Sequence, residues 1–250
     1  MTLQDFFTQN PEAAIALSGG VDSAYLLHAA ARWAKRVKAY CVASPFQPQF
    51  ELDTARSLAE EAGVELRFLA LDVLSVPEAA KNGPDRCYHC KKALFTALCK
   101  AASADGFLLV LDGTNASDAE DDRPGMRALR ELGIRSPLRE CGLSKAQIRS
   151  LAQEAGIGVW NRPSYACLAT RVATGEEITP ELLKHIEQAE NGLFAMGFSD
   201  FRVRVKGGSA LLQLPEEQHA EALARWAEIE TLSKGHFAQV RLDPQPRRST

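Results

Sequence analysis

Six small or polar residues, Ser18-Gly19-Gly20-Val21-Asp22-Ser23, stand between an apolar run and a segment with helical periodicity. A turn from a strand into a helix leaves backbone N–H groups without intrahelical partners, and the helix dipole makes that end partly positive. Glycine lets the backbone approach an anion closely, and the two serine hydroxyls add donors. We therefore predict a phosphate-binding turn, although a tight turn with a Ser or Asp helix cap would use the same residue types. The pattern G-x-x-x-x-G-K-[ST], which serves γ-phosphoryl transfer, is absent.

Thiol chemistry is the second possibility in this sequence. Cys87 and Cys90 have C-x-x-C spacing, which lets both sulfurs reach one metal ion or cluster. A redox pair, or a partial zinc site with His89, would use the same spacing. Cys167, in a loop rich in small residues, is the third candidate. The other cysteines lie in apolar or turn contexts that favour packing roles: Cys41, Cys99 and Cys141.

Further polar groups lie at the end of one predicted strand, within another and in a charged loop. Gly113, Thr114 and Asn115 end an apolar run, where their donors would suit a developing oxyanion. Arg202 and Arg204 alternate with apolar residues, so both guanidinium groups are expected on one face of a strand, where they would hold a phosphate or form a solvated polar surface. A charged loop offers metal or phosphate ligands, or simply a solvated segment: Asp118, Asp121, Asp122 and Arg123.

Short apolar runs alternate with helical segments over residues 1–160. The predicted strands are 13–17, 37–43, 66–73 and 107–114, and the predicted helices are 22–34, 50–62, 88–102 and 144–155. Nearly continuous apolar strands that alternate with helices indicate a parallel sheet covered on both faces. We predict a doubly wound α/β domain, with its ligands at the carboxyl ends of the strands.

Residues 161–250 have a different pattern, which predicts a small α+β domain. The predicted elements are a helix at 180–195, strands at 201–206 and 209–214, a helix at 215–232 and a strand at 236–242. Gly207 and Gly208 predict a tight hairpin turn between the two adjacent strands.

Composition limits the class of protein. The 250 residues are 46% hydrophobic and 24% charged with a net charge of −3, as in an ordinary globular protein without the basic field that attracts nucleic acid. No apolar run approaches the ~20 residues that span a bilayer, and the first residues lack the pattern of a signal peptide. We expect a cytoplasmic protein without membrane or nucleic-acid partners.

The six-residue turn resembles the PP-loop of the ATP-pyrophosphatase superfamily, whose fold is adenine nucleotide α-hydrolase-like. That likeness implies that ATP is cleaved between its α- and β-phosphates and that Asp22 lies near Mg²⁺. Two further stretches, D-G-T-N-A-S-D at 112–118 and N-R-P-S-Y-A-C-L-A-T-R at 161–171, resemble the LarE family of sulfur transferases. The resemblance implies adenylation of a carboxylate of a pyridinium dicarboxylate mononucleotide, then its conversion to a thiocarboxylate for the nickel-pincer nucleotide cofactor of lactate racemase. Residues 1–160 would form the ATP-binding and adenylation domain, and residues 161–250 the sulfur-transfer and substrate-phosphate domain.

Within this resemblance, one branch of the family sacrifices the sulfur of a single cysteine at the Cys167 position. Another branch has three cysteines, matching Cys87, Cys90 and Cys167, and holds a [4Fe-4S] cluster; this chain resembles that branch. The likeness also implies a substrate-phosphate site of four residues: Arg171, Glu190, Arg202 and Arg204. Homo-oligomers and other pincer-cofactor biosynthesis proteins are the implied partners. The alternatives are a PP-loop tRNA thiolase, for which the acidic charge balance is mildly unfavourable, and a non-catalytic nucleotide- or metal-binding protein.

Overall fold

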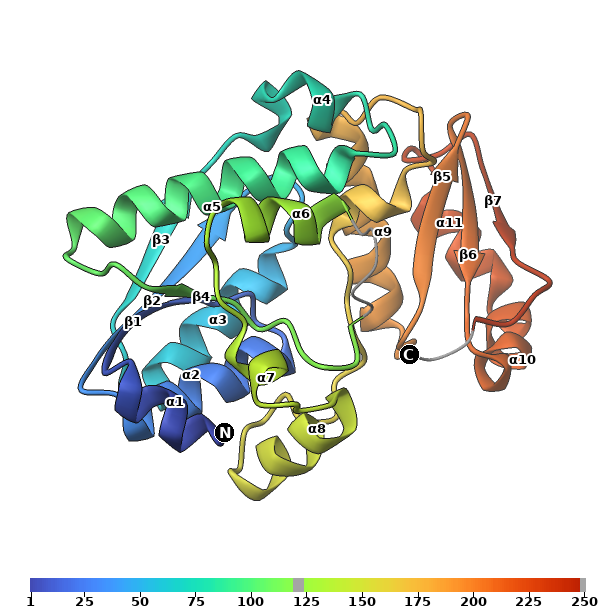
Figure 1. Cartoon of the computed structure of the whole chain (residues 1–250). Helices are drawn as coiled ribbons and strands as arrows, with labels where there is room; N and C mark the ends of the chain where they lie inside the picture. Colours follow the sequence, from blue (N-terminus) through green and yellow to red (C-terminus); the bar gives the residue numbers. More distant parts are fainter. Residues whose placement is uncertain (119–123, 248–250) are drawn as a thin grey trace. The chain divides into compact units, whose positions relative to one another are not determined.

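The computed structural model describes residues 1–118 and 124–247, which form two compact units (Figure 1). The first unit contains residues 1–76 and 85–162, and the second contains residues 77–84 and the described residues from 163 onward. The functional division predicted at residue 160 stays a prediction. The loop residues Asp121, Asp122 and Arg123 lie outside the described residues. No helix in the described ranges has both the length and the apolar character needed to span a bilayer.

The first unit contains a four-stranded parallel sheet in the order β3-β2-β1-β4, as the alternating pattern predicts. Its strands are β1 (Glu12–Ala16), β2 (Arg36–Ala43), β3 (Leu66–Ala70) and β4 (Val110–Leu111). The central strand β1 pairs with β2 on one side and, at Ala14 and Ile15, with β4 on the other. The carboxyl ends of β1 and β4 therefore lie next to each other, and the polar turns that follow them share one edge of the sheet.

Helices cover both faces of this sheet (Figure 1). Ala13 and Ile15 pack into one core, whereas Ala14 between them packs into the other. The first core contains residues of α1 (Leu3–Gln9), α2 (Val21–Trp33), α3 (Gln49–Glu61), α7 (Pro137–Glu140) and α8 (Lys145–Glu154). The second contains residues of α5 (Arg86–Ala104) and α6 (Pro124–Glu131). The doubly wound prediction is confirmed.

Several elements of the first unit differ from the prediction. The fourth strand is only two residues long, and Leu111 also forms an isolated parallel bridge with Arg135, whose carbonyl accepts from the Asp112 N–H. The third strand ends at Ala70, and Asp72 caps a short 3₁₀ turn, Val73–Ser75. Helices α1, α6 and α7 were not predicted, since they are short and their apolar residues are few.

The second unit has a three-stranded sheet in the order β5-β6-β7, of which β5 and β6 are antiparallel and β6 and β7 parallel. Its strands are β5 (Arg202–Lys206), β6 (Ser209–Gln213) and β7 (Gln239–Leu242). Its helices are α4 (Pro77–Ala80), α9 (Pro180–Ala195), α10 (Glu216–Ala224) and α11 (Trp226–Ser233), with a 3₁₀ turn, η2, at Leu168–Arg171. One face of the sheet packs on α9, α10 and α11 around a core that includes Val203, Leu212 and Ile229.

The hairpin prediction is confirmed, and one helix prediction is wrong. Gly207 and Gly208 have φ values of 54° and 73° and connect β5 to β6, as a two-residue turn of this hand requires. The helix predicted at 215–232 is instead two helices, because the backbone of Arg225 leaves helical geometry at φ −108° and its guanidinium binds the Met196 carbonyl.

Residues 77–84 leave the first unit and pack in the second. Asn82 is fully buried with a left-handed φ of 55°, and its side-chain amide donates to the carbonyls of Val172 and Ala173. The Gly175 N–H donates back to the Asn82 carbonyl. These bonds place the segment just before Cys87 beside the segment just after Cys167 within the second unit, a feature that the sequence alone did not indicate.

Candidate active site

The turn at residues 18–23 is closed by a serine hydroxyl. Ser23 Oγ donates to the Gly20 carbonyl at 3.0 Å and accepts from the Ser18 N–H at 3.2 Å. Gly20 is the N-cap of α2 and supplies no capping side chain. The first N–H groups of α2 therefore keep their donor capacity for a ligand, and a 13-residue helix adds its dipole.

Two glycines bring three backbone segments close together at this turn. Gly19 has a φ of 85°, and a Cβ there would lie 2.7 Å from the Glu51 carbonyl oxygen. A Cβ on Gly113, after β4, would lie 2.8 Å from the Ser23 backbone nitrogen. Both contacts are with backbone atoms, so neither residue can carry a side chain without displacing the start of α2.

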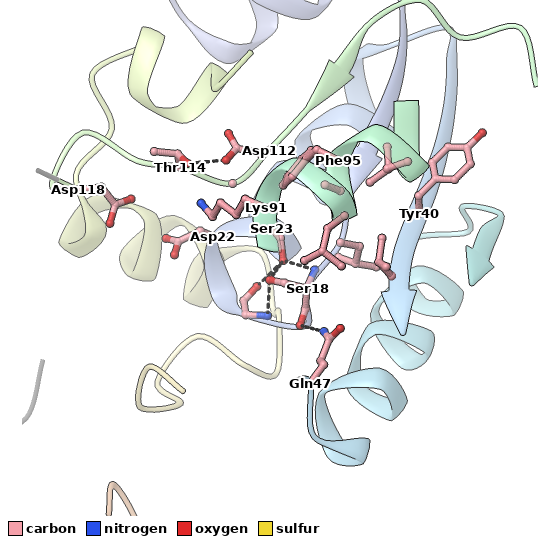
Figure 2. Close-up of a pocket in the computed structure, with 17 residues that line it drawn as sticks. Ser18, Asp22, Ser23, Tyr40, Gln47, Lys91, Phe95, Asp112, Thr114 and Asp118 are labelled. Carbon is pink, nitrogen blue, oxygen red and sulfur yellow. Dashed lines mark hydrogen bonds between the residues drawn. The ribbon is translucent and has the colours of Figure 1, made fainter. Parts of the chain in front are cut away.

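A cavity of about 310 Å³ opens at this edge of the first sheet (Figure 2). Most of the residues predicted to bind nucleotide line it: Ser18, Gly20, Asp22, Ser23, Gly113 and Thr114. The other two, Gly19 and Asn115, do not line the cavity and instead make contacts within the segments that form it. Gly19 packs on Glu51, and the N–H of Asn115 binds the Asp118 carboxylate at 2.9 Å, which folds the loop after β4.

The opposite part of the cavity wall is largely apolar. It is formed by Tyr40 and Val42 of β2 and by Leu94, Phe95 and Leu98 of α5. The α5 residues recur at helical spacing, so one face of this helix lines the cavity. A polar end beside an apolar wall suits a ligand that has both charged groups and a flat ring.

Asp22 has the features of a cation ligand. Its Oδ2 accepts from Lys145 Nζ at 2.5 Å, whereas Oδ1 is buried and has no hydrogen-bond partner among the described residues. Burial raises the pKa of this carboxyl despite the lysine. Asp118 lines the same cavity. Because Mg²⁺ prefers carboxylate and phosphate oxygens, the unpartnered oxygen fits a magnesium ion that would arrive with a nucleotide.

Two lysines at this site were not identified from the sequence. The turn at residues 18–23 itself contains no lysine. Lys91, on the cavity face of α5, reaches into the cavity (Figure 2). Lys145, the first residue of α8, pairs with Asp22. Neither lies near the turn in sequence. A signal for Lys145 was present in Ser144, which caps α8 and places the next residue at a helix start.

Cys87 and Cys90 lie in the first two turns of α5, on one side of the helix. Cys87 is exposed, Cys90 is half-buried, and Arg86 Nη2 lies 3.6 Å from Cys87 Sγ. Residue 87 also precedes the cavity-facing Lys91 by one helical turn, so this pair continues the helix face that lines the cavity.

The first turn of α5 is fastened to α6. The Tyr88 hydroxyl donates to Glu131 at 2.7 Å, and the Arg127 guanidinium lies 4.0 Å from the centre of the Tyr88 ring. Lys92 Nζ completes this group with a 2.8 Å bond to the Tyr88 hydroxyl. Tyr88, one of the two residues between the cysteines, is therefore held by three side chains.

The other three cysteines in the first unit are suited to packing. Burial raises the pKa of Cys41 to about 12 and also raises the pKa of Cys99 and of Cys141. These thiols stay protonated at neutral pH, so they are poor nucleophiles and poor metal ligands. In the described ranges, no group of three or more His, Cys, Asp or Glu side chains forms a metal site.

Cys167 belongs to the second unit, where it is half-buried and precedes η2. Its carbonyl accepts from the Thr170 N–H at 2.9 Å and from the Thr170 hydroxyl at 2.8 Å, which closes the turn. Among the predicted substrate-phosphate residues, Arg171 and Glu190 form a buried ion pair with a distance of 2.7 Å from Nε to Oε1.

The two arginines of β5 have different environments. Arg202 is only 6% exposed, and burial together with the neighbouring Arg171 lowers its pKa to about 10. The side chain of Arg204 instead lines a second cavity of about 280 Å³, with Arg171, Lys206 and Arg241 among its walls. This cavity gathers cations from β5 and β7 on one face of the small sheet, so it suits an anion.

Asp22→Asn is expected to stabilise the nucleotide-free protein at pH 7 and to weaken Mg²⁺-ATP binding about tenfold or more, the effect of losing one charged contact. Because the folded-state pKa of Asp22 is raised, ionisation costs more in the folded chain than in the unfolded chain. This cost is present above the folded-state pKa and disappears as pH falls towards the ordinary value of 3.8. Melting temperatures from pH 4 to 8 measure the difference, with the exposed Asp53→Asn as control. A variant that melts at or below wild type at pH 7 would contradict this account.

Comparisons with known proteins agree with this geometry. A family model described as asparagine synthase matches residues 7–117, which include the turn at 18–23 and the end of β4. Pyridinium-3,5-bisthiocarboxylic acid mononucleotide synthase of Lactiplantibacillus plantarum is 36% identical over 211 residues, covering 84% of this chain and 76% of the relative. An uncharacterized protein of Synechocystis sp. is 34% identical over 245 residues, covering 96% of this chain and 91% of the relative. Another, from Methanocaldococcus jannaschii, is 32% identical over 209 residues, covering 84% and 80%. By this identity and coverage, the chain belongs to the LarE family, within the PP-loop superfamily.

Proposed function

We propose that this chain is an ATP-dependent sulfur transferase that adenylates a carboxylate of a pyridinium dicarboxylate mononucleotide and converts it to a thiocarboxylate. The product would serve the nickel-pincer nucleotide cofactor of lactate racemase. The name of the Lactiplantibacillus relative supports the substrate class. The observation that carries the proposal is one cavity in which an uncapped helix start, the unpartnered oxygen of Asp22 and Lys91 meet, with Lys145 paired to Asp22.

A bound ATP would have its phosphates at the polar end of the cavity and its base at the apolar end. Its phosphates would meet the N–H groups at the start of α2 and the hydroxyls of Ser18 and Ser23, while its base would lie against Tyr40 and Phe95. Asp22 would hold Mg²⁺, which would supply positive charge to the phosphates. Lys145, which pairs with Asp22, would add a second positive charge on this side of the turn.

In the first step, a substrate carboxylate oxygen attacks the α-phosphorus, the bond from that phosphorus to the bridging oxygen breaks, and pyrophosphate leaves with the electron pair. Lys91 and the start of α2 stabilise the charge that moves onto pyrophosphate. Gly113 and Thr114, just after β4, line the same cavity. The Thr114 hydroxyl donates to Asp112, whose other oxygen accepts from Ser136, so the backbone N–H groups of this segment would be the donors.

In the second step, hydrosulfide attacks the acyl carbon and AMP leaves. Cys87, Cys90 and Cys167 would hold a [4Fe-4S] cluster that, when bound, supplies transferable sulfide at the iron without a protein ligand. Cys87 and Cys90 are fit for two ligand positions, since they share one side of a helix start.

The substrate phosphate would bind in the cavity of the second unit. Arg204, Lys206 and Arg241 provide positive charge around its wall. Arg204 also donates to the Thr170 carbonyl at 2.6 Å, in the turn closed onto Cys167. A phosphate at Arg204 would thus lie next to the segment that carries Cys167, the third proposed ligand of the cluster. The homo-oligomer and the other biosynthesis proteins expected as partners stay predictions.

The adenylation step is tested by the products. With ATP, Mg²⁺ and the dicarboxylate mononucleotide, the protein is expected to form equal amounts of AMP and pyrophosphate. Lys91→Gln is expected to lower kcat/KM about 100-fold, as the loss of one charge-stabilising donor does. Lys100→Gln, an exposed lysine on the same helix, is the control. Formation of ADP, or an unchanged rate in Lys91→Gln, would refute the proposal.

The sulfur source is tested by metal analysis after anaerobic purification. Wild type is expected to contain about four irons per chain with matching acid-labile sulfide, the count of one [4Fe-4S] cluster. Cys90→Ala is expected to lose nearly all of both, because a ligand is removed. Cys99→Ala, on the same helix but with a half-buried thiol whose pKa is raised, should retain them. An iron-free wild type that loses the Cys167 sulfur after one turnover would show sacrificial chemistry instead.

The phosphate site is tested through substrate affinity. Arg241→Gln is expected to raise KM for the mononucleotide about tenfold, with kcat and KM for ATP unchanged, because the interaction is the same in the ground state and the transition state. Lys184→Gln, an exposed lysine on α9 of the same unit, is the control. If KM for the mononucleotide does not change, the phosphate binds elsewhere.

A further inference from the structure

A buried polar cluster lies beneath the turn that carries Cys167. The side chains of Arg171 and Glu190 are 0% and 1% exposed. Charged residues are rarely buried this completely unless they are paired and hydrogen-bonded. If the hydrogen-bonding groups of this pair bind other protein groups, the pair holds the chain in place. If these groups are open, the pair can bind a ligand.

The donors of Arg171 are engaged within the protein. Its Nε and Nη2 donate to the two oxygens of Glu190 at 2.7 and 3.2 Å. Its Nη1 donates to the Ala166 carbonyl and to the Thr170 hydroxyl, both at 2.9 Å. A guanidinium has five N–H groups, and these four contacts leave little for a substrate phosphate. A phosphate that used these same donors would have to displace Glu190, the Ala166 carbonyl or the Thr170 hydroxyl.

Arg202 is engaged in a similar way. It donates to the Phe201 carbonyl at 2.6 Å and to the Ser164 carbonyl at 2.5 Å. The carbonyls on both sides of Tyr165 are therefore held by arginines, Ser164 by Arg202 and Ala166 by Arg171. Arg204, in contrast, lies at the wall of the anion-binding cavity.

Tyr165 and Glu190 connect this segment to the regular elements of the unit. The Tyr165 hydroxyl donates to Glu190 Oε2, and the Arg171 and Arg202 guanidinium carbons lie 4.4 and 5.3 Å from its ring centre. Glu190 Oε1 also accepts from the Val203 N–H at 3.0 Å. One carboxylate on α9 thus ties together β5, the tyrosine and the arginine.

We propose that Tyr165, Arg171, Glu190 and Arg202 are positioning residues, which fix the backbone on the N-terminal side of Cys167 so that its sulfur is held in one place relative to the phosphate at Arg204. This inference rests on the proposed function, because it takes the Cys167 thiolate as a ligand of the iron–sulfur cluster. It assigns Arg171, Glu190 and Arg202 a role different from the substrate contact expected from the family resemblance. Small displacements of reacting groups cost large factors in rate, so a rigid support has a direct catalytic value.

Tyr165→Phe is the sharpest test, because it removes one hydroxyl and keeps the ring between the arginines. Glu190→Gln is the second variant. The measurement is the rate at which iodoacetamide alkylates Cys167 in iron-free, nucleotide-free protein under reducing anaerobic conditions, read by peptide mass spectrometry. Cys87 in the same molecule is the internal reference, and amide hydrogen exchange over residues 164–171 is read in parallel.

Both variants are expected to alkylate Cys167 about threefold faster or more, relative to Cys87, and to lose amide protection over 164–171, because the turn opens more often. In the full reaction, kcat for thiocarboxylate formation should fall about tenfold, while KM for the mononucleotide stays within about twofold. Glu228→Gln removes the carboxylate of an exposed Arg–Glu pair in the same unit and should change none of these values. A purely structural defect would lower the melting temperature without the selective change at Cys167.

Two results would overturn the inference. One is a raised KM for the mononucleotide with unchanged Cys167 alkylation, which would return these residues to the substrate site. The other is no change in alkylation, amide protection or kcat. Failure of the proposed function has a different signature, since wild type would then release no pyrophosphate, and the alkylation and exchange measurements would still test the positioning role.

Discussion

Backbone N–H groups at the start of α2 lack partners within the helix, and the surrounding chain is built to keep them in one place and open to a ligand. Gly19 lies against the Glu51 carbonyl, Gly113 lies against the Ser23 nitrogen, and the Ser23 hydroxyl closes the turn. These contacts join α3, the end of β4 and the start of α2 through backbone atoms. A site made from backbone groups has no side-chain freedom to lose when it binds, so its geometry depends on the packing of the whole sheet.

Positively charged side chains have different roles in this protein, and their hydrogen-bond partners decide which role each one has. Arg171 is fully buried and its donors bind one carboxylate, one carbonyl and one hydroxyl, whereas Arg204 is exposed and lies with Arg241 at the wall of the cavity in the second unit. Around the turn at 18–23 the cations come from distant helices, and Lys145 offsets part of the burial cost of Asp22. Partner geometry, rather than charge alone, separates the groups that support the chain from those that face a ligand.

Much of the fold and of the nucleotide site could be predicted from sequence, because both depend on local patterns. Apolar runs between helical segments identified the parallel strands, and a glycine-rich turn after the first of them identified the phosphate site. Lys91 and Lys145 could not be found this way, since only the packing of α5 and α8 brings them to the cavity. The spacing of Arg202 and Arg204 was informative about the strand, but it could not show that Ser164 covers one of them. The excursion at 77–84 depends on the long-range contacts of Asn82 and left no local pattern.

The segment at residues 77–84 decides whether the second unit can be treated as a separate module of this chain. The small sheet and its helices look like an appended module, yet α4 and Asn82 come from a stretch embedded between β3 and α5. A gene fragment that began at residue 163 would encode the second sheet but not the amide that binds Val172 and Ala173. The second unit is therefore discontinuous in sequence, and a fragment that lacks residues 77–84 leaves two of its carbonyls without this buried donor.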